Sequence, residues 1–332
     1  MIERAIPLAM RHNHKQAALI ALQNYDLDWT QIRFNQRSDT CTFVIETNQE
    51  GTFLLRLHSG RTKEEITSEI AWLDLLKTKI DVPLPKGVLD RTGSETFRVE
   101  MGNGENCYAS LMRWVEGEHP SERLTEEQIC NEGVLLAKLH KAAQNLELPP
   151  GFNRPVWDEH SFRKAMTRLK LHYHCFLTDE EFEQYLSATE KLYIWLAKQH
   201  KHKNRKSYGV IHGDLHQGNI IFQQDEPRAI DFGRCGWGYY LYDVAHTILG
   251  LHPLQRELVI RGYESMNKLP EGWLQSLEHF TVMVMIENYC HHAPDPRETE
   301  GLKAEQPFAA AILRNYLKGE PFLFNMIEIN VV

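Results

Sequence analysis

Three side chains with the chemistry of phosphoryl transfer lie close together in the sequence. Asp214 stands in the run His-Gly-Asp, Asn219 follows it by five residues, and Asp231 opens the run Asp-Phe-Gly. Phosphoryl transfer needs a carboxylate that accepts the proton of an attacking hydroxyl, and oxygen ligands that hold Mg²⁺ on the phosphates. Taken singly, each residue is also an ordinary turn or cap residue, so the inference depends on the ordered set.

Short apolar segments must position these side chains. The pattern predicts strands at residues 210–211, 219–222 and 228–230. Gly213, Gly218 and the polar run 224–227 are typical of the turns between them. A hairpin running from Asn219 to Asp231 would bring these two residues to Asp214, at the corner of the preceding loop.

Residues 210–245 resemble the aminoglycoside phosphotransferase, choline kinase and homoserine kinase group of kinase-like enzymes. His212-Gly213-Asp214 stands where protein kinases have His-Arg-Asp, and Tyr242-Asp243-Val244-Ala245 follows. The resemblance implies that Asp214 is the catalytic base, that Asn219 and Asp231 hold Mg²⁺, and that Asp243 braces the catalytic loop. From its place at the start of a helix, Asp243 is also expected to accept the helix amides.

The resemblance also implies an α+β, bilobal protein-kinase-like fold with a small β-rich N-terminal lobe and a larger, mainly helical C-terminal lobe. The local patterns agree, because a helical leader within residues 1–30 and three strand patterns precede a helix pattern at 63–77. The expected domains are a nucleotide-binding lobe at 1–114, a hinge at 115–120 and a catalytic and acceptor-binding lobe at 121–332. Further strands are expected at 86–89, 96–99 and 108–114, and helices at 125–143, from 178, and at 254–263, 274–288 and 308–317.

The nucleotide phosphates need a cation from the small lobe and a helix Glu that orients it. Arg56 stands on a strand where the family has Lys, and Arg can grip phosphate through two bonds. Its expected partner is Glu69, on the polar side of the helix, with Glu65 as the alternative. Plain surface positions are the competing interpretation for these residues.

Two other parts of the expected nucleotide site are less specific. The turn 36–40 has no glycine, and Ser38 and Thr40 could offer donors to phosphate oxygens or form a plain polar hairpin. Adenine would use backbone groups from Arg113 to Val115. The expected co-substrate is ATP, and the glycine-free turn leaves GTP open.

Composition narrows the class of protein. The chain is 42% hydrophobic and 25% charged, as in ordinary globular proteins, and its net charge of −8 argues against a general nucleic-acid binder. It has no signal-peptide pattern and no apolar run that could cross a membrane. Its six cysteines are widely spaced, which indicates free thiols and a cytoplasmic protein. The oligomeric state is not indicated.

The favoured interpretation is a kinase that phosphorylates a small hydroxyl-bearing molecule. A protein Ser/Thr kinase is disfavoured because Asp231 to Tyr242 leaves little room for an activation segment. One further alternative is a catalytically weak binding protein of the same fold. Another is a metallophosphoesterase, which the pattern His212-x-Asp214-x-His216 weakly resembles. Aminoglycoside-, homoserine-, choline- and sugar-like acceptors all stay open. The candidate acceptor-binding residues are Asp158, Glu287, Asp295 and Glu298 among the acids, and Trp157, Tyr173, Trp237 and Tyr239 among the aromatics.

Overall fold

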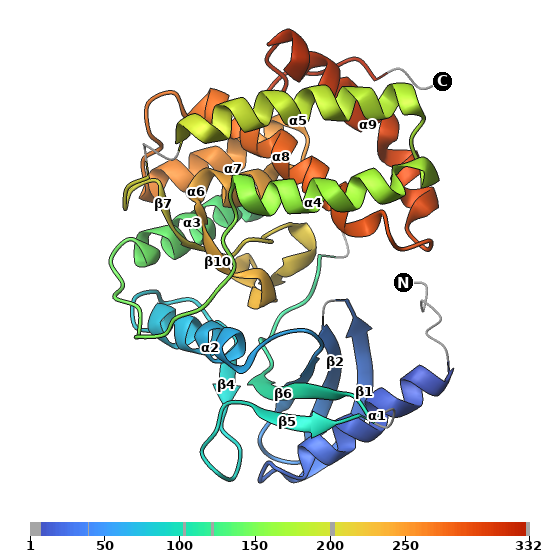
Figure 1. Ribbon diagram of the computed structural model, residues 1–332. Helices are drawn as coiled ribbons and strands as arrows, with labels where there is room; N and C mark the ends of the chain where they lie inside the picture. The colour runs from blue at the N-terminus through green and yellow to red at the C-terminus, as the bar shows by residue number, and fades with distance from the viewer. Residues whose placement is uncertain (1–7, 39, 102–103, 121–122, 200–202, 330–332) are drawn as a thin grey trace. The chain divides into compact units, whose positions relative to one another are not determined.

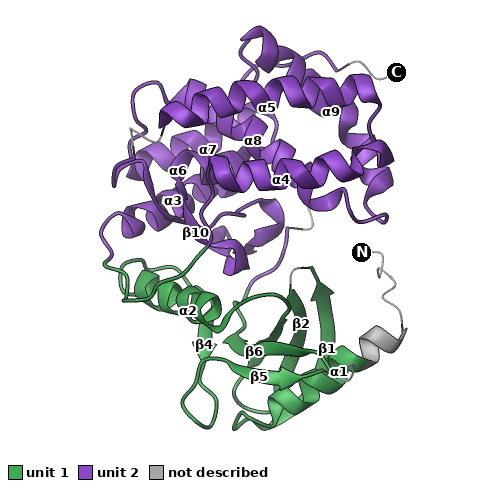
Figure 2. Ribbon diagram, in the orientation of Figure 1, with its two compact units in different colours: residues 1–116, 147–154 green, residues 117–146, 155–332 purple. Residues whose placement is uncertain are grey.

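The computed structural model of the chain (Figure 1) describes residues 8–38, 40–101, 104–120, 123–199 and 203–329. The chain forms two compact units (Figure 2). The first unit contains residues 1–116 and 147–154, and the second contains 117–146 and 155–332. The first division falls inside the stretch 115–120, whereas the return of residues 147–154 to the first unit is not indicated by the sequence pattern.

The first unit is built on an antiparallel sheet with the strand order β1-β2-β3-β6-β4, in which β5 also pairs with β6. Hairpin residues 48–51 join β2 to β3, and Gly51 supplies the positive φ of 84° that this turn requires. The strands are β1 (Trp29–Arg37), β2 (Thr40–Thr47), β3 (Thr52–His58), β4 (Lys86–Val88), β5 (Phe97–Glu100) and β6 (Asn106–Arg113).

The leader helix α1 (Leu8–Leu22) packs on one face of this sheet. Its residues Ala17, Ala18 and Ala21 are fully buried and share a core with Leu55 and Leu57 of β3. Because side chains alternate along a strand, the residue between these two leucines points to the opposite face. The first seven residues of the predicted leader lie outside the described part of the chain.

Helix α2 (Lys63–Lys77) begins and ends where the sequence predicts. Thr62 and Glu65 form a capping box, in which each side chain accepts the backbone N–H of the other residue. Ile66, Ile70 and Leu73 form its buried apolar stripe. The carboxylate of Glu65 is therefore engaged in the cap at the N-terminus of α2.

The second unit is mainly helical. Helix α8 lies at its centre, because its buried residues run around the whole helix from Leu277 to Cys290. Thr125 and Gln128 form a capping box at the start of α3, where the sequence predicts a helix. The helices are α3 (Glu126–Ala143), α4 (Glu159–His172), α5 (Asp179–Gln199), α6 (Tyr240–Ile248), α7 (Pro253–Met266), α8 (Trp273–His292) and α9 (Thr299–Lys318).

Two small sheets in the second unit position the candidate site. β7 (Tyr208–Ile211) pairs with β10 (Gly236–Tyr239), and β8 (Ile220–Gln223) pairs with β9 (Glu226–Ala229). Short 3-10 turns at Gln217–Asn219 and Phe232–Arg234 lead into β8 and β10.

The sequence pattern misses some elements of this unit. Helix α4 is not predicted, since its mean composition is polar, and β10 is too rich in glycine to stand out as a strand. Helix α9 starts nine residues before the predicted helix at 308 and contains Pro307. None of the described helices is both long enough and apolar enough to span a membrane.

Candidate active site

The loop after β7 carries Asp214. Gly213, just before it, has a φ of 76°, and a Cβ there would lie 2.6 Å from the backbone oxygen of Arg234. Only glycine fits this position without strain, because the backbone is left-handed and a neighbouring carbonyl is close. The tight turn at Gly213 leads directly into Asp214, whose carboxylate is partly exposed.

The β8–β9 hairpin connects Asn219 and Asp231, as the sequence predicts. Asn219 comes directly before β8, and its backbone oxygen accepts the N–H of Ile230 at 3.0 Å. Its amide Nδ2 donates to the backbone oxygen of Asp214 at 2.9 Å. The hairpin thus places Asn219 next to the loop of Asp214. It also pairs Asn219 with Ile230, the residue that comes directly before Asp231.

The donor atoms of these residues fit a magnesium ion. Asn219 uses its amide nitrogen in its contacts with Asp214 and His216, and its amide oxygen is the atom that could bind a metal ion. Asp231 is exposed, has a φ of 58°, and caps no helix with its side chain. Mg²⁺ takes oxygen ligands, and typically needs only one or two protein side chains beside phosphate and water. Accordingly, the described residues contain no cluster of three His, Cys, Asp or Glu side chains that would form a cage for the ion.

Asp243 braces the Asp214 loop from a fully buried position. Its carboxylate accepts the backbone N–H groups of His212 at 2.8 Å and Gly213 at 2.7 Å. The His140 imidazole also donates to it at 3.1 Å. Burial raises the pKa of Asp243, but His140 and the backbone donor of His212 outweigh this effect and lower it. The expected contact with helix amides is wrong, because α6 begins three residues earlier, at Tyr240.

Two histidines support the same loop. His212 donates from Nε2 to the backbone oxygen of Ile230 at 3.0 Å, which links the loop to the Asp-Phe-Gly turn. His216 accepts the N–H of Gly218 with Nδ1 at 2.9 Å. Burial lowers the pKa of His216, which favours the neutral form of its ring. These contacts use the two imidazoles inside the loop.

Two residues that the sequence interpretation misses face the Asp214 carboxylate. Arg234 Nη1 lies 4.0 Å and His246 Nδ1 lies 3.9 Å from Asp214 Oδ1. The guanidinium of Arg234 also stacks over the Trp157 ring, 4.7 Å from its centre. Burial lowers the pKa of His246 to about 4, so this ring is neutral near pH 7. The sequence positions of both residues could have indicated that they lie near the site. Arg234 follows Asp231 by three residues, and His246 follows Asp243 by one helical turn.

The sequence interpretation also misses a contact between the Asp214 loop and helix α3. Gln217 Nε2 donates to Glu132 Oε2 of α3 at 2.8 Å. Glu132 is fully buried, and burial raises its pKa to about 7, although the Gln217 contact lowers it slightly. Nothing in the sequence around Glu132 distinguishes it from a solvated helix residue.

In the first unit the structure brings Arg56 and Glu69 together. Arg56 Nη1 lies 2.5 Å from Glu69 Oε1, and Nη2 lies 3.4 Å from Oε2. Both side chains are buried, so neither the surface position considered for Arg56 nor the polar-side position expected for Glu69 is correct. Burial raises the pKa of Glu69, but Arg56 and Arg154 outweigh it and lower the pKa to about 2. The alternative partner, Glu65, uses its carboxylate in the capping box with Thr62.

The remaining residues expected at the nucleotide make local contacts with the protein backbone or are buried. Ser38 donates its N–H to the backbone oxygen of Thr40 at 3.1 Å, which closes the turn between β1 and β2, and Asp39 lies outside the described residues. The Arg113 side chain donates to the backbone oxygen of Glu50 at 3.1 Å. Val115 is buried, two residues after β6.

The candidate acceptor residues mostly have structural contacts. Asp158 caps α4, Asp295 pairs with Arg297, and Tyr173 donates to Asp179. Trp237 and Tyr239 belong to β10, and Trp157 donates from Nε1 to the backbone oxygen of Arg234 at 3.0 Å. Glu298 precedes α9 without capping it by its side chain.

Glu287 is the candidate acid that the structure places deepest. It is 6% exposed and accepts the Tyr242 hydroxyl at 2.7 Å. Burial raises its pKa to about 7, against smaller lowering effects of Tyr242 and Arg234. The aromatic ring of Tyr242 packs parallel to Trp157, the ring beneath Arg234.

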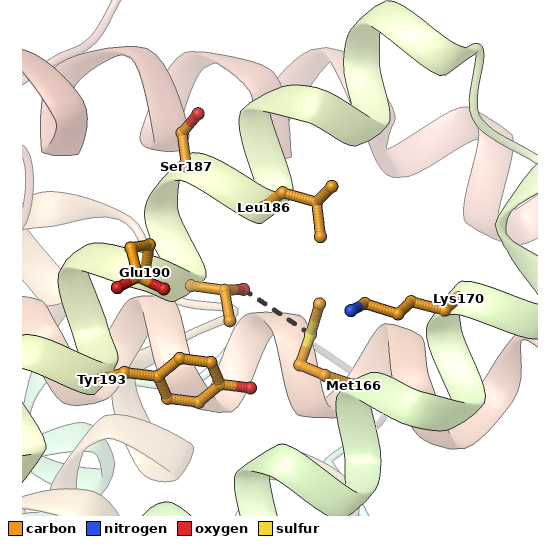
Figure 3. A pocket seen from close by; sticks show the side chains of 7 residues that line it. Met166, Lys170, Leu186, Ser187, Glu190 and Tyr193 are labelled. Carbon is orange, nitrogen blue, oxygen red and sulfur yellow. Dashed lines mark hydrogen bonds between the residues drawn. The ribbon is translucent and has the colours of Figure 1, made fainter.

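A pocket of about 360 Å³ lies between α4 and α5 (Figure 3). Lys170 and Glu190 supply its charged groups, and Thr189 donates to the Met166 sulfur within it. Its lining residues belong to α4 and α5 and not to the loops that carry Asp214, Asn219 and Asp231. The pocket is lined by Met166, Lys170, Leu186, Ser187, Thr189, Glu190 and Tyr193.

A β-rich unit with a buried Arg–Glu pair and a helical unit with a carboxylate loop and a polar hairpin define a kinase-like phosphotransferase. Residues 29–275 match the phosphotransferase enzyme family, which is well over half of the 332 residues. The chain therefore belongs to this family. The predicted family and the predicted enzyme class, a small-molecule kinase, are confirmed.

Individual relatives agree with this assignment. The amicoumacin kinase of Bacillus subtilis (strain 168) is 22% identical over 331 residues, covering 93% of this chain and 94% of its own. The structure of a microcompartment-associated aminopropanol kinase has a TM-score of 0.78 at 24% identity and covers 94% of this chain and 100% of its own. An amicoumacin kinase in complex with AMP-PNP, Ca²⁺ and Ami has a TM-score of 0.75 at 18% identity, covering 95% and 96%. These likenesses confirm the predicted α+β, protein-kinase-like fold class.

Proposed function

We propose that this protein transfers the γ-phosphoryl group of ATP, with the help of Mg²⁺, to a hydroxyl group of a small molecule. The observation that carries the proposal is the β8–β9 hairpin, which connects Asn219 and Asp231 and ties Asn219 to the loop of Asp214. In this reaction, positioning and electrostatic stabilisation supply most of the rate enhancement. The bracing of the loop by Asp243 favours that kind of catalysis.

We assign the roles as follows. Asp214 accepts the proton of the acceptor hydroxyl, and Asn219 and Asp231 hold Mg²⁺. Arg56, oriented by Glu69, binds the nucleotide phosphates. When bound, Mg²⁺ would neutralise the negative charge that develops on the phosphates.

A small acceptor is favoured over a protein. Only eight residues, 232–239, separate Asp231 from helix α6, and four of them form β10. This leaves no long activation segment to dock a peptide. Amicoumacin and aminopropanol, named in the relatives, are the first compounds to test, together with homoserine-, choline-, aminoglycoside- and sugar-like alcohols. The free cysteines favour a reducing cytoplasm as the working compartment.

The test is a thermal-shift titration with ATP and GTP, each with and without Mg²⁺, on the wild type and Asp231→Asn. We expect a Mg²⁺-dependent rise in melting temperature for the wild type and its loss in the variant, because a ligand stabilises the state that binds it. The nucleotide that gives the rise is then used in a phosphate-transfer assay with the panel of alcohols. A wild-type protein that responds to neither nucleotide would contradict the proposed activity.

A further inference from the structure

A second arginine contacts the carboxylate of Glu69. Arg154 Nη1 lies 3.7 Å from Glu69 Oε2, the same oxygen that lies 3.4 Å from Arg56 Nη2. The Arg154 side chain is 1% exposed and that of Glu69 is 3% exposed. Charges at this separation and burial interact much more strongly than exposed ion pairs do. The Glu69 carboxylate is therefore held by two guanidinium groups.

Arg154 belongs to a segment that returns to the first unit after α3. Residues 147–154 follow that helix in sequence but pack within the first unit, on α2. The backbone N–H of Asn153 donates to Ser68 Oγ at 2.9 Å, and Arg154 Nη1 donates to the backbone oxygen of Glu65 at 2.8 Å. Residues 65, 68 and 69 share one face of α2, because three or four residues complete a helical turn. The segment thus contacts α2 at the turn that carries Glu69.

Resting on the proposed function, we propose that Arg154 is a positioning residue for nucleotide binding. It fixes Glu69 and the first turns of α2, and Glu69 in turn fixes Arg56 for the nucleotide phosphates. A lysine could supply the charge at residue 154. Arg154 makes both contacts, to the Glu65 carbonyl and the Glu69 carboxylate, through Nη1. A lysine would have to place its ammonium at that same point on a side chain of different shape and length, so the rescue by lysine should be partial.

A histidine lies beside this pair. His58 lies on the same face of β3 as Arg56, two residues away, and its Nε2 contacts Ser110 Oγ at 2.8 Å. Burial, with help from Arg56, lowers the pKa of His58 to about 3, so this ring is neutral. The charges around the Glu69 carboxylate in these contacts are those of Arg56 and Arg154.

The test measures the dissociation constant of AMP-PNP with Mg²⁺ by calorimetry for the wild type, Arg154→Met and Arg154→Lys. We expect Arg154→Met to weaken binding about tenfold, the size expected for one hydrogen-bonded charge contact, and Arg154→Lys to recover part of the loss. Arg154→Gln keeps a polar group in the site and carries the test if Arg154→Met does not fold.

Two controls separate positioning from general stability. Arg256 is another buried arginine, and it donates to the backbone oxygens of Ile248 and Leu323 in the second unit. Arg256→Met should lower the melting temperature without weakening AMP-PNP binding. In a Glu69→Gln background, Arg154→Met should add little further loss, because both residues act through one contact.

The outcomes distinguish this inference from the proposed function. If the wild type does not bind AMP-PNP with Mg²⁺, the proposed function is overturned and the inference with it. If the wild type binds and folded Arg154→Met or Arg154→Gln binds equally tightly, only the role of Arg154 is overturned. Additive losses in the Glu69→Gln background would also contradict a role that acts through Glu69.

Discussion

The carboxylate of Asp243 accepts the backbone N–H of Gly213 at 2.7 Å, although the two residues lie 30 positions apart in the sequence. The same carboxylate accepts two further donors, from His212 and His140. Three donors on one fully buried carboxylate fix the peptide just before Asp214. The geometry of the candidate base therefore depends on a residue of α6.

We expect Asp243→Asn to lower the free energy of unfolding by about 3 kcal/mol, because an amide offers one acceptor oxygen and turns an NH₂ group toward a buried donor. Turnover should fall with stability, since the Asp214 loop loses its support. Urea denaturation and the phosphate-transfer assay measure the two effects. Unchanged stability would show that the loop is held by other contacts.

Asp214→Asn should lower kcat by about 10²- to 10⁴-fold, the usual contribution of a general base. The KM for ATP should change little, because we place the nucleotide on Arg56 and the Mg²⁺ ligands. Steady-state kinetics with the acceptor found in the panel tests this split. An equal loss of nucleotide affinity would place Asp214 at the metal instead.

Helices α3 and α7 cross so closely at Gly133 and Gly262 that we expect neither glycine to tolerate a larger residue. A Cβ at Gly133 would lie 2.0 Å from the backbone oxygen of Val259, and one at Gly262 would lie 1.9 Å from that of Cys130. We expect Gly133→Ala to destabilise the protein by about 3 kcal/mol, since both helix backbones would have to separate.

Gly301 of α9 is the matched control for this substitution. A Cβ there meets nothing within 4 Å, so Gly301→Ala should be neutral or stabilise the helix by up to about 1 kcal/mol. Thermal unfolding of the two variants compares them directly. A stable Gly133→Ala protein would mean that the helices can move apart at small cost.

The buried carboxyl of Glu287 should make stability depend on pH. Its pKa rises from an ordinary 4.5 to about 7 in the folded protein. Between these values the folded state holds a proton that the unfolded state has released, so this contribution to stability is lost as the pH rises through the window. Glu287→Gln has no such proton and can still accept the Tyr242 hydroxyl, so it should gain stability relative to the wild type as the pH rises.

The measurement is urea denaturation of both proteins from about pH 5 to about pH 8. Glu300→Gln, at an exposed glutamate of α9, is the control and should show no pH-dependent difference from the wild type. A difference between Glu287→Gln and the wild type that stays constant with pH would contradict the raised pKa of Glu287.

The sequence by itself determined the family, the fold class and most of the local elements, but not α4 or β10. Asp214, Asn219 and Asp231 lie within one short segment of the chain, so their spacing is visible in the sequence. The bounds of α2 and the caps of α3 follow from side-chain periodicity and capping residues within a few positions. Such signals can be read directly because their causes are local.

Only the tertiary structure decided which distant groups support the site. Asp243 meets His140 across 103 positions, and Asn153 meets Ser68 across 85. In the sequence, Glu69 looks like a residue of the polar helix face and Arg154 like part of a loop. Both are buried where the returning segment 147–154 packs on α2, and burial turns ordinary charged residues into strong partners. Partners brought together by chain topology leave no periodic pattern in a single sequence.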